Sequence, residues 1–177
     1  MSNVKQRLKA KDFVEKWKNR GDEKQDTQSF WIDLLSNVYD VENTTDYIDY
    51  EKRVKVGDNT KFIDGYIADT RVLIEQKSLG IDLDKPERQS GGAMLTPYEQ
   101  AKRYANELPQ SEHPKWIVVS DFKSFRIYNM DSITPEREVQ EVLLDNLSVE
   151  FTRMNFLVNS KDDHTAKELE VSIKAGE

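Results

Sequence analysis

Three residues between positions 64 and 77 combine side chains that metal-dependent hydrolysis requires. Asp64 precedes Glu75 and Lys77, and Asp69-Thr70 lies between them. If Asp69-Thr70 is a two-residue hairpin turn, Asp64 faces Glu75 across two antiparallel strands. Because side chains alternate along a strand, Lys77 then shares their face and Gln76 points to the other. Asp-Thr is not a preferred two-residue turn, and a bulge or longer turn would shift this pairing.

Two carboxylates that face each other repel, and a divalent cation between them reverses the sign of the interaction. Asp64, Glu75 and the backbone carbonyl of Gln76 are therefore predicted ligands of Mg²⁺, with Mn²⁺ as a substitute. Such a cation activates water and stabilises charge on a phosphate. Lys77 would position the attacking water, help to deprotonate it or stabilise negative charge. The alternative is a surface hairpin with solvated charges, which the apolar run 72–74 disfavours.

The composition favours oxygen ligands and leaves the question of a nucleic-acid partner open. The 177 residues include no cysteine and two histidines, which excludes thiolate sites and disfavours a histidine-rich zinc site. No membrane span or signal peptide is visible, so a cytoplasmic protein without a membrane partner is expected. The formal net charge of −7 argues against nucleic-acid binding. Residues 1–25, however, hold eight Lys/Arg and four Asp/Glu, which indicates either a phosphate-facing part or a helix with a solvated charged face.

Periodicity and capping signals predict the elements that must position these residues. Helices are expected over residues 10–20, 27–39, 96–108 and 138–147. Strands are expected over residues 47–56, 61–68, 71–78, 116–120 and 124–129, with a mobile polar loop over 81–92. The helix after Thr96 has the clearest start, because Pro97 and Glu99 complete a capping box. This order predicts an α/β fold in which helices pack against a sheet.

At Asp64, Glu75 and Lys77 the sequence resembles the PD-(D/E)XK nuclease superfamily, although Ile63 stands where that family often has proline. The resemblance implies a restriction-endonuclease-like core, a mixed sheet flanked by helices. The pair Gln100 and Tyr104 resembles the Gln-X-X-X-Tyr motif of type I restriction motor subunits and related nucleases. It implies that this pair helps to bind DNA. The alternative for Tyr104 is a place in the apolar stripe of its helix.

The segment 21–31 resembles the N-terminal helix region of MmeI-type (type IIL, single-chain type IIG) restriction-modification enzymes. The resemblance places Glu23 near the metal, with Gln28 in support. The alternative is a solvated Glu23 beside a helix capped by Asp26 or Thr27. In this family an endonuclease domain, here residues 1–158, precedes a helical spacer, an adenine methyltransferase and a target-recognition domain. Residues 159–177 would be the linker and the start of that spacer, which makes the chain an expected fragment.

The resemblance also implies the partners and cofactors. They are double-stranded DNA, the methyltransferase and target-recognition domains of the same parent chain, and a second nuclease domain if both strands are cut by a dimer. S-adenosylmethionine would belong to the methyltransferase part alone. The function expected is thus a Mg²⁺-dependent type II restriction endonuclease active in phage defence. Two alternatives stay open at this stage: a non-catalytic DNA- or protein-binding relative, which the net charge of −7 favours, and a structure-specific repair nuclease.

Overall fold

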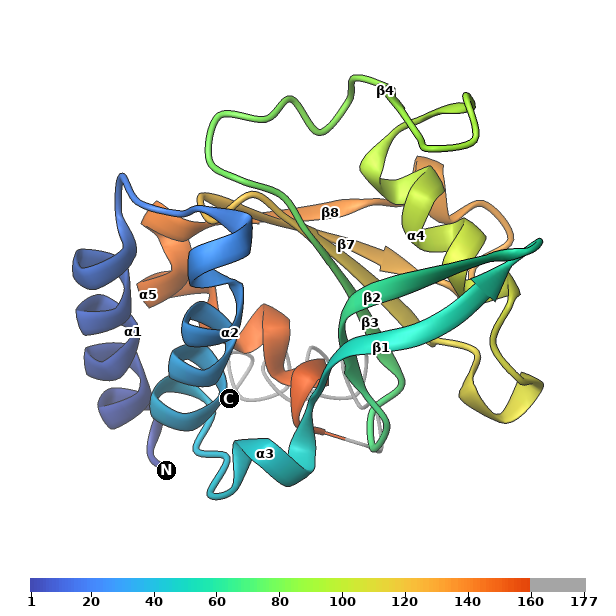
Figure 1. Cartoon of the computed structure of the whole chain (residues 1–177). Helices are drawn as coiled ribbons and strands as arrows, with labels where there is room; N and C mark the ends of the chain where they lie inside the picture. The colour runs from blue at the N-terminus through green and yellow to red at the C-terminus, as the bar shows by residue number, and fades with distance from the viewer. Residues whose placement is uncertain (160–177) are drawn as a thin grey trace.

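A six-stranded mixed sheet forms the centre of the protein in the computed structural model, which describes residues 1–159 (Figure 1). Its order is β1-β2-β3-β6-β7-β8, and the β3–β6 pair is parallel whereas the other neighbours are antiparallel. The strands are β1 (Asp49–Val56), β2 (Asn59–Ile67), β3 (Val72–Gln76), β6 (Trp116–Ser120), β7 (Ser124–Asn129) and β8 (Gln140–Leu143). Helices cover the sheet on both faces, so the predicted α/β fold with a mixed, helix-flanked sheet is confirmed.

Side-chain alternation divides the apolar residues of the sheet between two cores. The helices α1, α2 and α5 lie together on one side of the sheet, and α4 lies on the other (Figure 1). Ile74 belongs to the first core, whereas its neighbour Leu73 belongs to the α4 core. Consequently Gln76 faces α2, and Glu75 faces α4. The helices are α1 (Asn3–Trp17), α2 (Glu23–Asp33), α3 (Thr44–Tyr47), α4 (Pro97–Asn106) and α5 (Leu147–Glu150).

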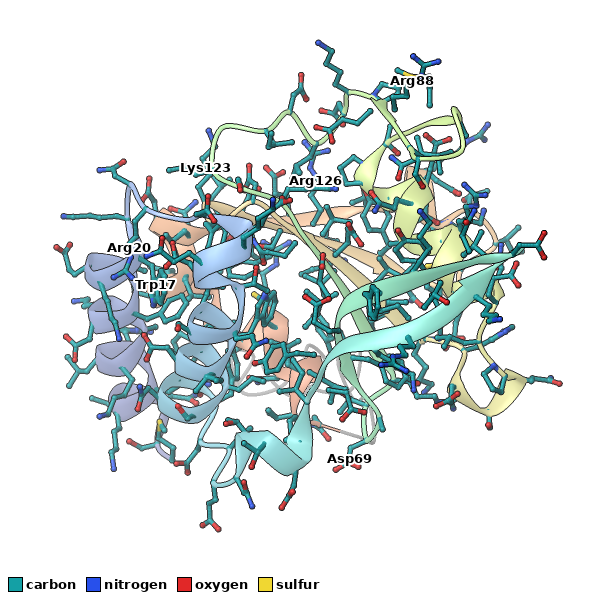
Figure 2. All side chains as sticks on the ribbon, viewed as in Figure 1. Trp17, Arg20, Asp69, Arg88, Lys123 and Arg126 are labelled. Atoms are coloured by element: carbon teal, nitrogen blue, oxygen red, sulfur yellow. The ribbon has the colours of Figure 1, made fainter. Side chains whose placement is uncertain are left out.

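The hairpin of β2 and β3 has the register that the sequence predicts. Ile67 pairs with Val72 and Gly65 pairs with Ile74, and the Arg71 N–H donates to the carbonyl of Ala68 at 3.3 Å. The turn is therefore the two residues Asp69-Thr70, although this dipeptide is not a favoured turn. Arg71 follows it with a φ of 52°, in the left-handed region. In Figure 2 Asp69 marks this turn. Asp64 lies at the other end of the β2–β3 ladder, one residue before its last pair, Gly65 with Ile74.

The two N-terminal helices begin earlier than the sequence predicts. The Ser2 hydroxyl accepts from the Lys5 N–H and the Asp22 carboxylate accepts from the N–H groups of residues 24 and 25, so these residues cap α1 and α2. The expected starts at residues 10 and 27 are wrong, because the earlier residues of both helices are polar or, like Val4 and Leu8, exposed, and so mark no buried face. Helix α1 ends at Trp17, and the guanidinium of Arg20 lies 4.0 Å from the centre of its ring (Figure 2). After α2, residues 34–38 continue as a π-helix.

The segment between α1 and α2 must approach the sheet closely. Gly21 has a φ of 152°, and a Cβ atom there would lie 2.2 Å from the ring of Phe122. A side chain at this position would therefore overlap the aromatic core. The carbonyl of Gly21 accepts from the Leu79 N–H at 3.0 Å, which joins the start of α2 to the chain just after β3.

The second half of the sheet corrects one prediction. Strands β6 and β7 have the predicted bounds, but residues 138–147 do not form the single helix that was predicted. They contain β8, which pairs with β7 through Val142 and Phe125, and then a 3-10 turn over Leu144–Asn146. Val139, Val142 and Leu143 have helical spacing, yet only Val142 is buried, while the other two are 40% and 43% exposed. Without β8, strand β7 would be an edge strand with unpaired backbone N–H and C=O groups, and pairing with β8 satisfies them. Such a pairing between strands leaves no signal in the local sequence pattern.

The polar loop after β3, predicted to be mobile, contains regular structure of its own. It contains a small hairpin of β4 (Glu87–Arg88) and β5 (Met94–Leu95), and Arg126 of β7 holds Asp84 through two hydrogen bonds of 2.7 and 3.1 Å. Helix α4 follows with the predicted capping box of Thr96 and Glu99. Within residues 1–159 no helix is long and apolar enough to cross a membrane. The predicted linker and spacer, 159–177, lies outside the described residues from position 160 on.

Candidate active site

Glu75 is a buried carboxylate in a central strand. All five residues of β3 are buried, and Glu75 is 2% exposed. Its Oε1 lies 3.4 Å from the Nζ of Lys77, the residue after Gln76 at the end of the strand. Its Oε2 is buried and has no hydrogen-bond partner among the described residues. An unsatisfied buried carboxylate oxygen is costly, and this one is available to a ligand.

Asp64 reaches the same place from β2. The β2–β3 ladder ends at the Gly65–Ile74 pair. Beyond it, the backbone N–H of Gln76 also faces β2 and donates to Oδ2 of Asp64 at 2.7 Å. The N–H and C=O of one residue in a strand point to the same neighbour, so the Gln76 carbonyl is also directed toward β2. The structure thus gathers Asp64, Glu75, Lys77 and the backbone of Gln76, as the hairpin register predicts.

The electrostatics of the site oppose two ionised carboxylates. Burial raises the pKa of Glu75 well above its usual value, and the charge of Asp64 raises it further. Burial also raises the pKa of Asp64 to about 6, with smaller contributions from Glu51 and Glu23, while the Gln76 N–H and Lys77 lower it. For Lys77, burial lowers the pKa, but Glu75 and Glu23 outweigh it, so that the pKa is raised. The protein alone therefore holds negative charge here at an energetic cost.

Glu23 lies at the first position of α2 and joins this helix to the end of β3. Its backbone N–H donates to the Ser78 hydroxyl at 2.8 Å, and its Oε2 accepts from the Ser78 N–H at 3.1 Å. Glu23, Gln28, Glu51 and Asp64 line one open hollow next to the site. The expected alternative of a solvated Glu23 beside a helix capped by Asp26 or Thr27 is wrong, because Asp22 caps α2 and Glu23 is bound to Ser78.

Gln100 and Tyr104 extend the site onto α4. The Nζ of Lys77 donates to Oε1 of Gln100 at 3.1 Å, and Nε2 of Gln100 donates to the Tyr104 hydroxyl at 3.0 Å. Tyr104 is 7% exposed and packs in the α4 core, so its predicted place in the apolar stripe is confirmed, while its hydroxyl contacts Gln100. The contact between Gln100 and Lys77 is not apparent in the sequence, because it depends on how α4 crosses β3.

Gln76 supports the site from the other face of the sheet. Its Oε1 accepts from the indole N–H of Trp31 at 2.8 Å, and its Nε2 donates to the carbonyl oxygens of Lys77 and Ser120 at 3.0 and 3.3 Å. This side chain is 2% exposed. The Gln76 side chain therefore connects Trp31 of α2 to the backbone carbonyls of Lys77 and Ser120, and so fixes the backbone at Lys77.

Glu51 is a neighbour of the site that the sequence does not single out. The β1–β2 register pairs Tyr50 with Gly65 and Lys52 with Ile63, so Glu51 and Asp64 oppose each other where the ladder is interrupted. Glu51 has a φ of 53°, in the left-handed region. The signal that could have found it is Gly57-Asp58, the two-residue turn of the β1–β2 hairpin. Pairing of Val56 with Asn59 across this turn places position 51 opposite position 64.

The donor set suits a hard divalent cation. Residues 1–159 contain no group of three or more Asp, Glu, His or Cys side chains placed to bind one metal ion. Two carboxylates and one carbonyl are present instead, all oxygen donors, and this is the kind of incomplete set that leaves room for water and substrate oxygens around Mg²⁺. The unpartnered Oε2 of Glu75 is the observation that fits such an ion best.

A helix-flanked mixed sheet with an Asp, a Glu and a Lys at the open end of a hairpin is compatible with a nuclease-like core. Comparison with protein families agrees: the family described as "MmeI, N-terminal domain" matches residues 8–177. The chain therefore belongs to this family, whose members are N-terminal parts of restriction-modification enzymes. No curated protein and no solved structure that was compared with the chain matches it.

Proposed function

We propose that the chain is the Mg²⁺-dependent endonuclease domain of a restriction-modification enzyme, and that it hydrolyses DNA phosphodiester bonds. The observation that carries this proposal is Glu75, whose buried carboxylate has Lys77 on one oxygen and no partner on the other. Membership of the MmeI N-terminal family supports it. Double-stranded DNA is the proposed substrate, and the other domains of the parent chain would select the site.

Each residue has a distinct proposed role. Asp64, Glu75 and the Gln76 carbonyl would hold Mg²⁺, or Mn²⁺ in its place, with Glu23 beside them. When bound, such a cation stabilises the charge that develops on the phosphate and favours deprotonation of water. The Lys77 ammonium group has three N–H donors, of which two are directed to Glu75 and Gln100. The third is available to the attacking water or to a phosphate oxygen. Gln100 is thus proposed to orient Lys77, and Tyr104 to orient the amide of Gln100.

Titration of the 177-residue chain with Mn²⁺ in a calorimeter tests the metal site directly. We expect saturable binding that Glu75→Gln weakens by about tenfold or more, because one ionised ligand is lost. Incubation of the same protein with plasmid and Mg²⁺ should produce nicked or linear DNA that EDTA prevents. If the wild-type chain binds no Mn²⁺ even with DNA present, the non-catalytic DNA- or protein-binding relative, which the net charge of −7 favours, becomes the better description.

The contact between Gln100 and Lys77 predicts a rate effect. Gln100→Leu removes the acceptor from Lys77 Nζ, and we expect the single-turnover cleavage rate to fall by about tenfold, the worth of one hydrogen bond to a charged group. Gln100→Glu retains an acceptor and should recover part of the rate. DNA affinity, measured with Ca²⁺ in place of Mg²⁺, should stay within about twofold. A loss of affinity with an unchanged rate would instead support the DNA-binding role that the family resemblance implies.

A further inference from the structure

A narrow hollow borders the candidate active site on the side away from Glu23. Its walls are the end of the β1–β2 hairpin, with Lys61, and the loop of the β4–β5 hairpin, with Ser90. Its floor is α4, which contributes Gln100, Arg103 and Tyr104. Figure 1 shows the β1–β2 hairpin extending beside α4 at this position. Because Gln100 also binds Lys77, the hollow is one side chain away from the catalytic lysine.

The charge of this hollow is opposite to that of the protein. It contains two cationic side chains, Lys61 and Arg103, and no acidic one. The three other hollows described for residues 1–159 all contain acidic side chains. The sign of the charge in this hollow is thus opposite to the net charge of −7 of the chain.

The two cations also lack acidic partners. Other basic side chains of this region form ion pairs, such as Lys102 with Glu136 at 3.3 Å and Lys52 with Glu112 at 3.0 Å. Within the described part of the chain, neither Lys61 nor Arg103 forms an ion pair, and Lys61 contacts the neutral Ser90 hydroxyl. Both therefore bring a positive charge to the lining of the hollow with no acidic group to neutralise it, and a bound anion would supply that partner.

We infer that Lys61 and Arg103 form a phosphate-binding subsite for the DNA backbone next to the scissile phosphate. The inference rests on the proposed function for the identity of the anion. Arginine and lysine are the usual phosphate ligands, and the Ser90 hydroxyl adds a neutral donor on the same wall. Arg88 is excluded from the subsite, since its side chain lies at the outer edge of β4 and away from α4 (Figure 2). The subsite would bind any sequence, because it touches phosphate alone.

Binding of a short labelled duplex by fluorescence anisotropy, in EDTA and over a range of salt concentrations, tests the inference without cleavage. Lys61→Gln and Arg103→Gln should each weaken binding several-fold and reduce the slope of log affinity against log salt by about 1. Ser90→Asp, which sets a carboxylate beside Lys61, should weaken binding as well. Lys102→Gln is the matched control: it is the neighbour of Arg103 in α4, equally exposed but paired with Glu136, and should leave the slope unchanged.

The outcomes separate this inference from the proposed function. Weaker binding in the three subsite variants, with an unaffected control, supports the subsite whether or not the wild-type chain cleaves plasmid. Equal losses in Lys102→Gln would indicate a general charge effect and overturn it. Unchanged binding in all variants, or no DNA binding by the wild-type chain, would overturn it too. Conversely, a failure of Mn²⁺ binding with a normal subsite result would remove the nuclease proposal alone.

Discussion

Lys77→Ala is expected to reduce the plasmid cleavage rate by a factor of about 10³ or more, as loss of a group that acts on transition-state charge usually does. The substitution removes the Nζ that lies 3.4 Å from Glu75 and 3.1 Å from Gln100. The rate would be measured under single turnover with saturating Mg²⁺. In the full-length parent enzyme, methylation should be spared.

An exposed lysine provides the control for this experiment. Lys123→Ala, in the turn between β6 and β7, should cleave at the wild-type rate (Figure 2). Lys77→Ala also leaves Glu75 without its partner, so its circular dichroism spectrum and Mn²⁺ binding must be recorded alongside the rate. A variant that folds, binds Mn²⁺ and cleaves at more than about a tenth of the wild-type rate would contradict the assigned role of Lys77. Loss of cleavage and methylation together would indicate misfolding instead.

Local signals predict the parts of the fold that depend on neighbouring residues. The capping box at Thr96, the apolar strand Trp116–Ser120 and the register of the β2–β3 hairpin were all predictable, because each is specified within a few residues. Strand β8 was not, since Val139, Val142 and Leu143 have helical spacing and the edge of β7 decides the outcome. The early starts of α1 and α2 were missed because their first turns bury no apolar side chain, although Ser2 and Asp22 are good caps.

In the candidate site, too, the features set by neighbouring residues could be predicted and those set by long-range packing could not. Asp64, Glu75 and Lys77 could be assembled from the assumed Asp69-Thr70 turn and strand alternation, and Gln100 with Tyr104 from helix spacing. What could not be predicted is how the two sets meet, because the Gln100–Lys77 contact depends on the crossing of α4 over β3. The orphaned Oε2 of Glu75 is likewise a product of burial by distant elements. Long-range packing thus converts two motifs into one connected site.

Asp64→Asn is expected to stabilise the metal-free protein at neutral pH while abolishing its Mn²⁺ binding. Burial raises the pKa of Asp64 from 3.8 to about 6, so the folded state binds its proton more tightly than the unfolded state. That contribution to stability is complete below about pH 4 and is lost as the pH rises through about 6. Asparagine stays neutral and can still accept the Gln76 N–H. At pH 8 the gain should be about 1–3 kcal/mol.

Urea unfolding in EDTA at several pH values between 4 and 8 measures this gain, which should vanish toward pH 4. Asp69→Asn is the matched control, because Asp69 is exposed at the turn of the same hairpin and should show no such trend (Figure 2). Addition of Mn²⁺ should raise the wild-type unfolding midpoint and leave that of Asp64→Asn unchanged, since binding stabilises only a folded state that binds. If Asp64→Asn proves no more stable than the wild type at pH 8, the buried charge is already compensated by the protein. The site would then have no electrostatic need for a cation, and the metal would have to be sought elsewhere.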